Sequence, residues 1–172
     1  MSDKNLMKNI EIDKVVINIG SGSDSKLQDN AKRLLEKITH MKPADSLSKR
    51  RNPTFKISKG TKIGAFVTLR GKNANSLLPK LFEAADNKLK PKAITTNTIN
   101  FGIREYIDIN GIKYDPSIGM LGMNVNIALK RPGFRVADKK IKRGKIKEHH
   151  KKISNDEITE FVKNKFNVSI GE

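Results

Sequence analysis

Four segments of the chain alternate apolar and polar residues, and this period of two constrains the fold more than any other feature. The segments lie at 10–19, 64–70, 99–109 and 123–129. Because successive side chains of a strand point to opposite faces of a sheet, the alternation predicts strands with one buried face. In the first segment Val15, Ile17 and Ile19 share one face, and Lys14 and Asn18 share the other. We therefore expect a sheet that is covered on one side only.

Three further segments have the spacing of helices. Two of them, at about 26–40 and 75–86, place apolar residues on one helical stripe, and the first should begin at a capping box formed by Ser25 and Gln28. Pro79 fits the first turn of a helix, so the second helix should begin one or two residues before it. A short C-terminal helix should begin at a capping box formed by Ser154 and Glu157. The order of elements predicts an α+β fold, a mostly antiparallel sheet with helices packed on one face and the other face open.

Excess positive charge is confined to two parts of the chain. The formal net charge is +17, yet residues 46–82 hold nine Lys and Arg residues with no acid, and residues 130–152 hold eleven with two acids. Either run alone could be a solvated surface. Together they hold all the excess charge, which favours a polyanionic partner because unneutralised like charge destabilises a compact state. We expect one domain over 1–172, with a basic loop at about 46–62 and a C-terminal basic segment at about 130–152.

The face of the sheet that should remain open is rich in hydrogen-bond donors. Its expected polar residues are Lys14, Asn18, Thr68, Arg70, Asn100, Arg104, Asn124, Asn126 and Lys130. Such groups suit the phosphates, 2′-hydroxyls and base edges of RNA, although any half-buried sheet has a polar outer face. Only Phe66 and Tyr106 could stack on bases there, so we expect recognition of RNA shape and backbone by a single RNA-binding domain.

The residues of catalytic and metal sites do not form a recognisable set. The chain has no cysteine, His40 stands alone, and His149 and His150 lie among lysines, where phosphate contact is a better use than zinc binding. The Gly20-Ser21-Gly22 turn lacks the rest of a nucleotide-binding fingerprint. We expect a protein that is not an enzyme and has no catalytic residue, no metal, no cofactor and no small-molecule substrate. No apolar run suits a membrane span or signal peptide, so a cytoplasmic location is expected.

Several long blocks of the sequence resemble one known family. They are IDKVVINIGSG (12–22), FKISKGTKIGAFVTLRG (55–71) and NFGIREYIDINGIKYD (100–115). In matching order and spacing they are similar to the universal large-subunit ribosomal protein numbered five, which binds 5S rRNA. The blocks at 114–125 and 130–151 resemble its archaeal and eukaryotic branch. The resemblance covers about 6 to 170.

The resemblance implies a component of the large ribosomal subunit that joins 5S rRNA to large-subunit rRNA in the central protuberance. Asn18 and Thr68 match a family asparagine and threonine on the 5S-binding strands, and both fall on the polar face derived above. Lys14 and Arg70 join them as expected 5S rRNA contacts. A family glutamine linked with 5S rRNA is replaced here by Met41.

The resemblance also implies partners beyond 5S rRNA. The basic loop matches a family loop that faces the peptidyl-site tRNA, through Lys49, Arg50, Arg51 and Asn52. Another edge is expected to bridge to a protein of the small-subunit head. The C-terminal basic segment is assigned to large-subunit rRNA on its charge alone, through Arg131, Arg135, Lys139, Lys140, Lys142, Arg143, Lys145 and Lys147.

Three other functions remain open on the sequence alone. A DNA-compacting protein would account for the charge but not for the Asn and Thr face. An enzyme acting on RNA would need a catalytic constellation that the sequence does not single out. A membrane-surface protein would need an amphipathic helix of greater apolar strength than the basic segment offers.

Overall fold

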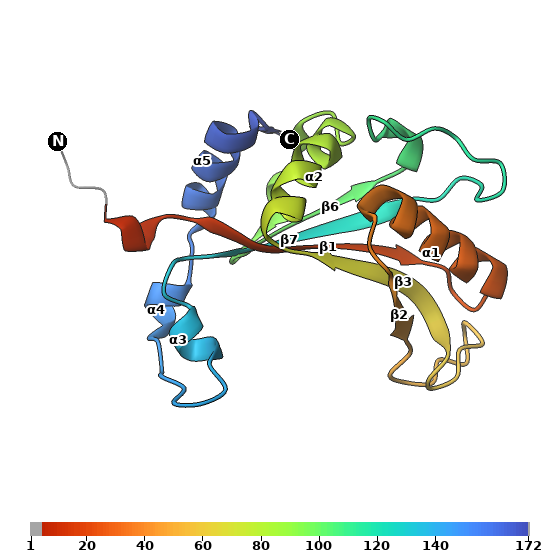
Figure 1. Cartoon of the computed structure of the whole chain (residues 1–172), viewed down its shortest axis with the longest axis horizontal. Helices are drawn as coiled ribbons and strands as arrows, with labels where there is room; N and C mark the ends of the chain where they lie inside the picture. The colour runs from red at the N-terminus through yellow and green to blue at the C-terminus, as the bar shows by residue number, and fades with distance from the viewer. Residues whose placement is uncertain (1–4, 172) are drawn as a thin grey trace.

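A six-stranded antiparallel sheet organises the computed structural model, which describes residues 5–171 (Figure 1). Its strand order is β2-β3-β1-β7-β6-β5. The strands are β1 (Glu11–Gly20), β2 (Ala44–Leu47), β3 (Lys62–Leu69), β5 (Ile94–Thr95), β6 (Thr98–Ile103) and β7 (Met123–Lys130). A parallel pair, β4 (Lys88–Leu89) with β8 (Ser169–Ile170), forms a second small sheet. The expected α+β fold is confirmed.

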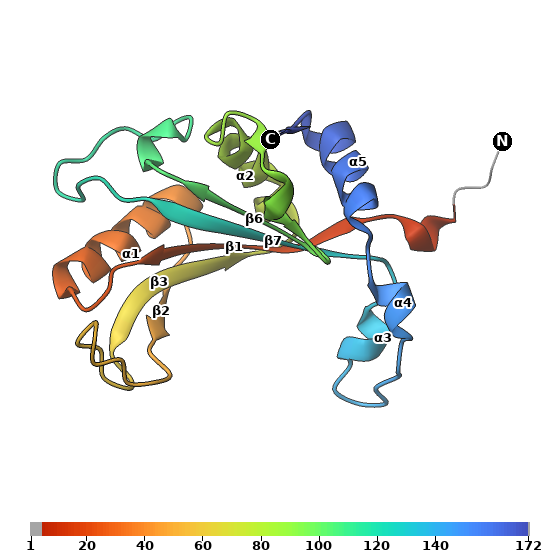
Figure 2. The same ribbon diagram turned by 180° about the vertical axis from the view of Figure 1, so that it is seen from behind.

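Three helices cover one face of the main sheet (Figures 1 and 2). They are α1 (Ser25–Thr39), α2 (Gly71–Glu83) and α5 (Asn155–Phe166). The remaining helical turns are η1 (Leu6–Lys8), η2 (Pro91–Ala93), η3 (Tyr106–Asp108), α3 (Arg135–Asp138) and α4 (Glu148–Lys151). Within residues 5–171 no helix combines the length and apolarity that crossing a bilayer requires.

The core lies between the sheet and this helical layer. The inward side chains of the central strands, Val15 and Ile17 among them, are fully buried against α1 and α2. Three aromatic rings pack together where α2, β6 and α5 meet. The ring centroid of Phe82 in α2 lies 5.3 Å from that of Phe101 in β6 and 5.0 Å from that of Phe166 in α5. The opposite face of the sheet has no helix packed over its centre in Figures 1 and 2.

The C-terminal helix begins where its sequence predicts. Ser154 Oγ accepts a hydrogen bond from the Glu157 backbone N–H, and the Glu157 side chain accepts one from the Ser154 backbone N–H. This reciprocal pair satisfies two donors that the first turn of a helix otherwise leaves free. The capping box is confirmed.

The start of α2 differs from the expectation. The helix begins at Gly71, directly after β3, so Pro79 lies in its interior and not in its first turn. A proline at this position removes the hydrogen bond to the carbonyl four residues earlier, at Asn75. Because Asn75 and Pro79 are both exposed, that carbonyl faces solvent and the helix continues.

The third expected strand was predicted too long, because β6 ends at Ile103 and the chain turns into η3. This turn breaks the alternation, so Tyr106 is fully buried and Ile107 is 38% exposed, the reverse of the predicted parity. The Tyr106 hydroxyl accepts a hydrogen bond from the Asp115 backbone N–H at 2.9 Å. Tyr106 is therefore a core residue, and the interpretation that it could stack on RNA was wrong.

Both basic segments project away from the helical layer. The basic loop closes a hairpin between β2 and β3, in which Asn52 and Ile57 exchange backbone hydrogen bonds. The C-terminal basic segment leaves the end of β7 and forms α3 and α4. Figures 1 and 2 show these two extensions at opposite ends of the sheet, both on the side that α1, α2 and α5 leave uncovered.

Candidate nucleic-acid interface

The uncovered side of the main sheet, hereafter the open face, carries an ordered array of amides. Strand register places Asn124 of β7 between Gly102 of β6 and Asn18 of β1. In the next row Asn126 of β7 lies between Asn100 of β6 and Val16 of β1. Four asparagines on three neighbouring strands therefore share one patch, as the alternation in the sequence predicts.

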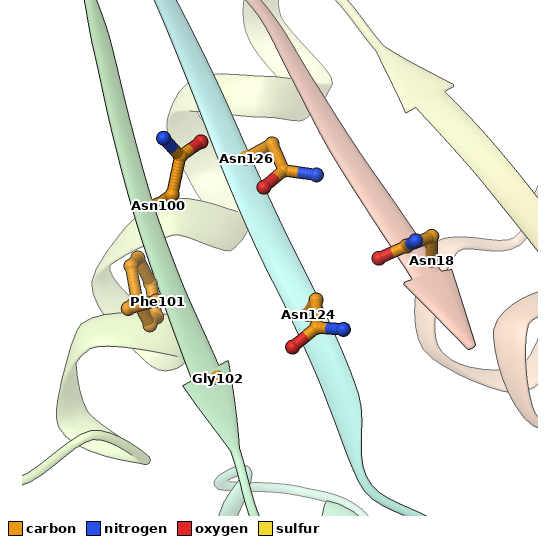
Figure 3. A pocket seen from close by; sticks show the side chains of 6 residues that line it. All are labelled: Asn18, Asn100, Phe101, Gly102, Asn124 and Asn126. Atoms are coloured by element: carbon orange, nitrogen blue, oxygen red, sulfur yellow. The ribbon is translucent and has the colours of Figure 1, made fainter. Parts of the chain in front are cut away.

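These asparagines line a shallow hollow of about 430 Å³ (Figure 3). Figure 3 shows the amide oxygen of Asn18 directed toward β7, and the amide nitrogens of Asn124 and Asn126 directed toward β1. The Asn18 oxygen is buried and accepts no hydrogen bond from any part of the chain that the structure describes. A buried acceptor without a donor costs about 1–3 kcal/mol, so this atom favours a ligand that supplies a donor.

A second hollow adjoins the first across β1 and has an apolar side. Asn18 and Asn126 line both hollows, and Phe66 of β3 lines the second. Phe66 pairs directly with Asn18 across the β1–β3 ladder and remains partly exposed on the open face. The second hollow thus combines amide edges with an aromatic ring.

Thr68 lies on the same face in the row of Asn126, and Lys14 and Arg70 lie further toward the other end. Thr68 pairs with Val16, and Lys14 pairs with Ala128, so both belong to the open face. Lys14 and Thr68 are partly exposed, while the side chain of Arg70 is 60% exposed. The structure therefore brings the four residues predicted to contact 5S rRNA, Asn18 being one of them, to one surface.

A single carboxylate, that of Asp13, interrupts this basic end. The β1–β7 register shifts between Ile12 and Lys14, and this irregularity turns Asp13 toward the open face. Its Oδ1 lies 2.9 Å from Lys130 Nζ and 3.4 Å from an Arg70 guanidinium nitrogen. Strict alternation along the strand would place Asp13 on the helix side, so the sequence pattern does not predict this carboxylate on the open face.

The basic loop exposes most of its cations. Lys49, Arg50, Arg51 and Asn52 are all exposed, and Lys56 and Lys59 follow them in the same hairpin. No acid occurs between Ser46 and Phe82. The loop therefore presents an uninterrupted positive surface beside the open face.

Polar contacts fix the orientation of this loop through its first strand. Gln28 of α1 is 3% exposed and accepts a hydrogen bond from Ser21 Oγ at 2.6 Å. Its amide nitrogen donates to the Gly64 carbonyl at 2.8 Å and to Asp45 Oδ1 of β2 at 2.9 Å. Gln28 is thus committed to the core, and Asp24 caps α1 in place of the expected box of Ser25 and Gln28.

Asp45 also binds two lysines, one on each side. Lys32 Nζ of α1 lies 2.6 Å from Asp45 Oδ1, and Lys62 Nζ of β3 lies 3.2 Å from Oδ2. The hydrogen bond from Lys32 is the main reason that the pKa of Asp45 falls to about 2, with smaller contributions from Gln28 and Lys62. These contacts join β2 to α1 and β3.

The C-terminal basic segment divides into cations that are free and cations that hold the protein together. Exposed side chains include Arg135, Lys139, Lys140, Lys142, Lys145 and Lys147. Arg131 differs, because its side chain is 15% exposed and pairs with Glu157 of α5 at 2.7 Å. Arg143 donates to the Ala137 carbonyl and so closes the turn after α3. These two arginines serve the fold of the segment.

Chemistry other than binding has little support in the geometry. Among residues 5–171 no three His, Cys, Asp or Glu side chains converge as a metal site would require. His149 and His150 lie next to each other in α4, with ring centroids 4.1 Å apart, among the lysines. The uncovered amides and exposed cations can bind an anionic, donor-bearing polymer.

Comparison with known proteins finds two family models that together cover most of the chain. Residues 5–57 match the model described as Ribosomal protein L5, and residues 62–164 match the model that describes the C-terminus of the same ribosomal family. The boundary between the two matches falls at the end of the basic loop. Strands from both regions interleave in one sheet, since β1 lies between β3 and β7.

Curated relatives from archaea align over nearly the full length. A large ribosomal subunit protein uL5 from Sulfurisphaera tokodaii is 40% identical over 98% of this chain and 96% of its own length. The uL5 of Nanoarchaeum equitans is 39% identical over 95% of this chain and 97% of its own. The uL5 of Archaeoglobus fulgidus is 40% identical over 91% of this chain and 88% of its own.

Proposed function

The chain belongs to the ribosomal protein L5 family, and from this premise we propose that it binds 5S rRNA with the open face of its sheet. Membership makes it a structural component of the large ribosomal subunit, bound to the ribosome in the cytoplasm, and not an enzyme. The observation that best supports the proposal is the open face itself, where amides, a hydroxyl and basic groups gather on one uncovered surface.

Within this proposal the residues of the open face have distinct roles. Asn18 and Thr68 supply neutral hydrogen-bonding groups near the centre of the sheet, and they fix the RNA in register. Lys14 and Arg70 supply charge at the end near Asp13, where they contact phosphate oxygens. Neutral groups at the centre with cations at the rim suit a structured RNA whose backbone bends over the sheet.

The two basic extensions would serve other nucleic acids of the ribosome. The C-terminal basic segment binds large-subunit rRNA through its exposed cations, Arg135, Lys139, Lys140, Lys142, Lys145 and Lys147. The basic loop faces the peptidyl-site tRNA through Lys49, Arg50 and Arg51, with Asn52 in the hairpin bridge. A protein in these contacts joins 5S rRNA to the large-subunit rRNA in the central protuberance. Another edge of the molecule meets a protein of the small-subunit head.

The test of 5S rRNA binding uses a double variant of the open face. Replacing Asn18 and Thr68 by Ala should weaken binding to an archaeal 5S rRNA transcript more than binding to a scrambled duplex of equal length. Fluorescence anisotropy at fixed salt measures both affinities. Equal losses for the two RNAs would show that the open face is not the specific site.

A general nucleic-acid protein is the second candidate, because exposed cations bind any phosphate backbone. It predicts that duplex DNA competes with 5S rRNA at the same concentration as unlabelled 5S rRNA. The amide array favours the first proposal, since DNA phosphates need no such array. Competition with equimolar duplex DNA in the same assay separates the two.

A further inference from the structure

We propose that the paired hollows of the open face bind one unstacked nucleoside of the RNA through its base edge or 2′-hydroxyl, and not through its phosphate. The inference rests on the proposed RNA binding and specifies which part of the RNA enters this site. It assigns new ligand contacts to Asn100, Asn124, Asn126 and Phe66.

The hydrogen-bonding chemistry of the amide hollow favours a nucleoside. The oxygen of Asn18 is a buried acceptor with no donor within the described chain. An RNA phosphodiester carries only acceptors, so it cannot satisfy this atom. A base amino group, a base imino N–H and a ribose 2′-hydroxyl are the donors that RNA has to offer.

The distribution of charge leads to the same conclusion. Neither hollow is lined by a Lys or Arg side chain of the described chain. Lys14 lies four residues from Asn18 along β1, which corresponds to about 13 Å at the usual rise of a strand. A phosphate placed among the asparagines would exchange its water shell for neutral amides. The cations at the basic end of the open face and in both basic segments bind phosphates better, because their hydrogen bonds are charge-assisted.

The second hollow offers a surface for the face of a base. Phe66 pairs with Asn18 in the ladder, so a base that stacks on this ring brings its edge toward the amides of Asn18 and Asn126. Stacking on an aromatic side chain contributes about 1–3 kcal/mol for one base. Tyr106 is buried, and Phe101 at the amide hollow already stacks on Phe82 of the core at 5.3 Å, so Phe66 is the ring best placed to receive a base.

Gly102 leaves the amide hollow accessible at its β6 edge. A Cβ atom at this position would lie 3.3 Å from Asn124 Oδ1, which is closer than most Cβ contacts. A longer side chain here would therefore cover the amide of Asn124. The glycine keeps a carboxamide exposed that a nucleoside can reach.

Nucleotide-analogue interference on an archaeal 5S rRNA transcript tests the inference. Transcripts carrying 2′-deoxy, inosine or 7-deaza-adenosine substitutions, and a set with ethylated phosphates, are partitioned by binding to the wild type and to the double variant Asn124→Ala, Asn126→Ala. We expect the variant to bind about 5- to 150-fold more weakly, as loss of a bidentate base contact would. At one nucleotide the base-analogue or 2′-deoxy interference should disappear in the variant, while the ethylation pattern stays unchanged.

The outcomes separate the possibilities. Loss of base-analogue interference identifies a base edge, and loss of 2′-deoxy interference identifies the ribose; either supports the inference. Loss of ethylation interference, or an unchanged map with the variant, overturns it while leaving 5S rRNA binding intact. Failure of the wild type to bind 5S rRNA would instead overturn the proposed function.

Two further variants test the role of the Phe66 ring and control for indirect effects of a substitution. Phe66→Leu keeps an apolar side chain and removes the aromatic ring, so it should weaken binding without changing which 2′-deoxy positions interfere. Lys139→Gln with Lys142→Gln changes charge far from the hollow and should leave the base and ribose map intact. An interference map altered by the lysine variant would show that the Asn effect is indirect, and this too would overturn the inference.

Discussion

Removing four lysines of the C-terminal basic segment should change the salt dependence of RNA binding by a predictable amount. Lys139, Lys140, Lys142 and Lys145 are exposed, and they are chosen because Arg131 and Arg143 are engaged within the protein. Replacing all four by Gln removes up to four phosphate contacts. Each contact releases about 0.9 counterion on duplex RNA or DNA, so the slope of log K against log salt should fall by about 3.6.

This slope fixes the size of the effect at any salt concentration. Between 50 and 200 mM salt the variant should lose about 150-fold less affinity than the wild type, and near 150 mM it should bind about 10³-fold more weakly. These values are upper limits, reached if every lysine meets a phosphate. Because lysines act here as charges, 5S rRNA and an unrelated duplex should be affected alike.

Fluorescence anisotropy with labelled RNA at five or more salt concentrations measures the slope directly. The control carries the same charge change on the helical layer, with Lys26, Lys72, Lys80 and Lys163 replaced by Gln, all of them exposed on α1, α2 and α5. The control should keep the wild-type slope. Parallel plots for the wild type and the segment variant would refute the reasoning, as would an equal reduction in both variants.

Three other changes test the supports of this surface. Replacing buried Gln28 by Leu removes the acceptor of the Ser21 hydroxyl and a donor to the Gly64 carbonyl, so chemical denaturation should show a loss of about 2–4 kcal/mol in unfolding free energy; an unchanged midpoint would contradict the role of this network. Because Lys32 and its neighbours lower the pKa of Asp45 from 3.8 to about 2, the ionised carboxylate stabilises the fold above pH 4 and this contribution disappears as the pH falls toward 2. The wild type should therefore lose more stability than Asp45→Asn across that interval, as thermal melts between pH 5 and pH 2 would measure, whereas parallel pH profiles would argue against the ion pairs. Replacing Asp13 by Asn frees Arg70 and Lys130 for one more phosphate, so affinity for any RNA should rise about fivefold at 150 mM salt; weaker binding would show instead that the carboxylate orients the two cations.

Local patterns in the sequence predict the sheet and its faces well, because burial imposes the period of two wherever a strand stays regular. Val15, Ile17 and Ile19 are buried, and Asn18, Asn124 and Asn126 lie on the open face as their parity requires. The prediction fails where the backbone leaves that regularity. Tyr106 turns inward because β6 ends, and Asp13 turns outward because β1 is irregular beside it.

Contacts between distant residues are invisible to such patterns. Gln28 was assigned to a helix cap from its spacing, yet its partners at Gly64 and Asp45 are 36 and 17 residues away. For the same reason the sequence did not predict β2 or the pairing of β4 with β8. These strands are too short to show a recognisable pattern of residues. Arg131 and Lys139 look equivalent in the sequence, and only the nearby Glu157 distinguishes the structural arginine from the free lysine.

Separating charge from hydrogen-bonding geometry explains how so basic a chain can remain selective. Cations alone bind any RNA, and their contribution to the affinity falls steeply with salt. A neutral amide array contributes little to the association rate, but it fixes the position of the RNA on the sheet. In this fold the cations lie at the two ends of the sheet and in its extensions, and the amides lie between them. If the open face binds RNA as we propose, an RNA attracted by the ends is held most tightly when it places a donor-bearing nucleoside over Asn18, so the selectivity should increase as salt weakens the cationic contacts.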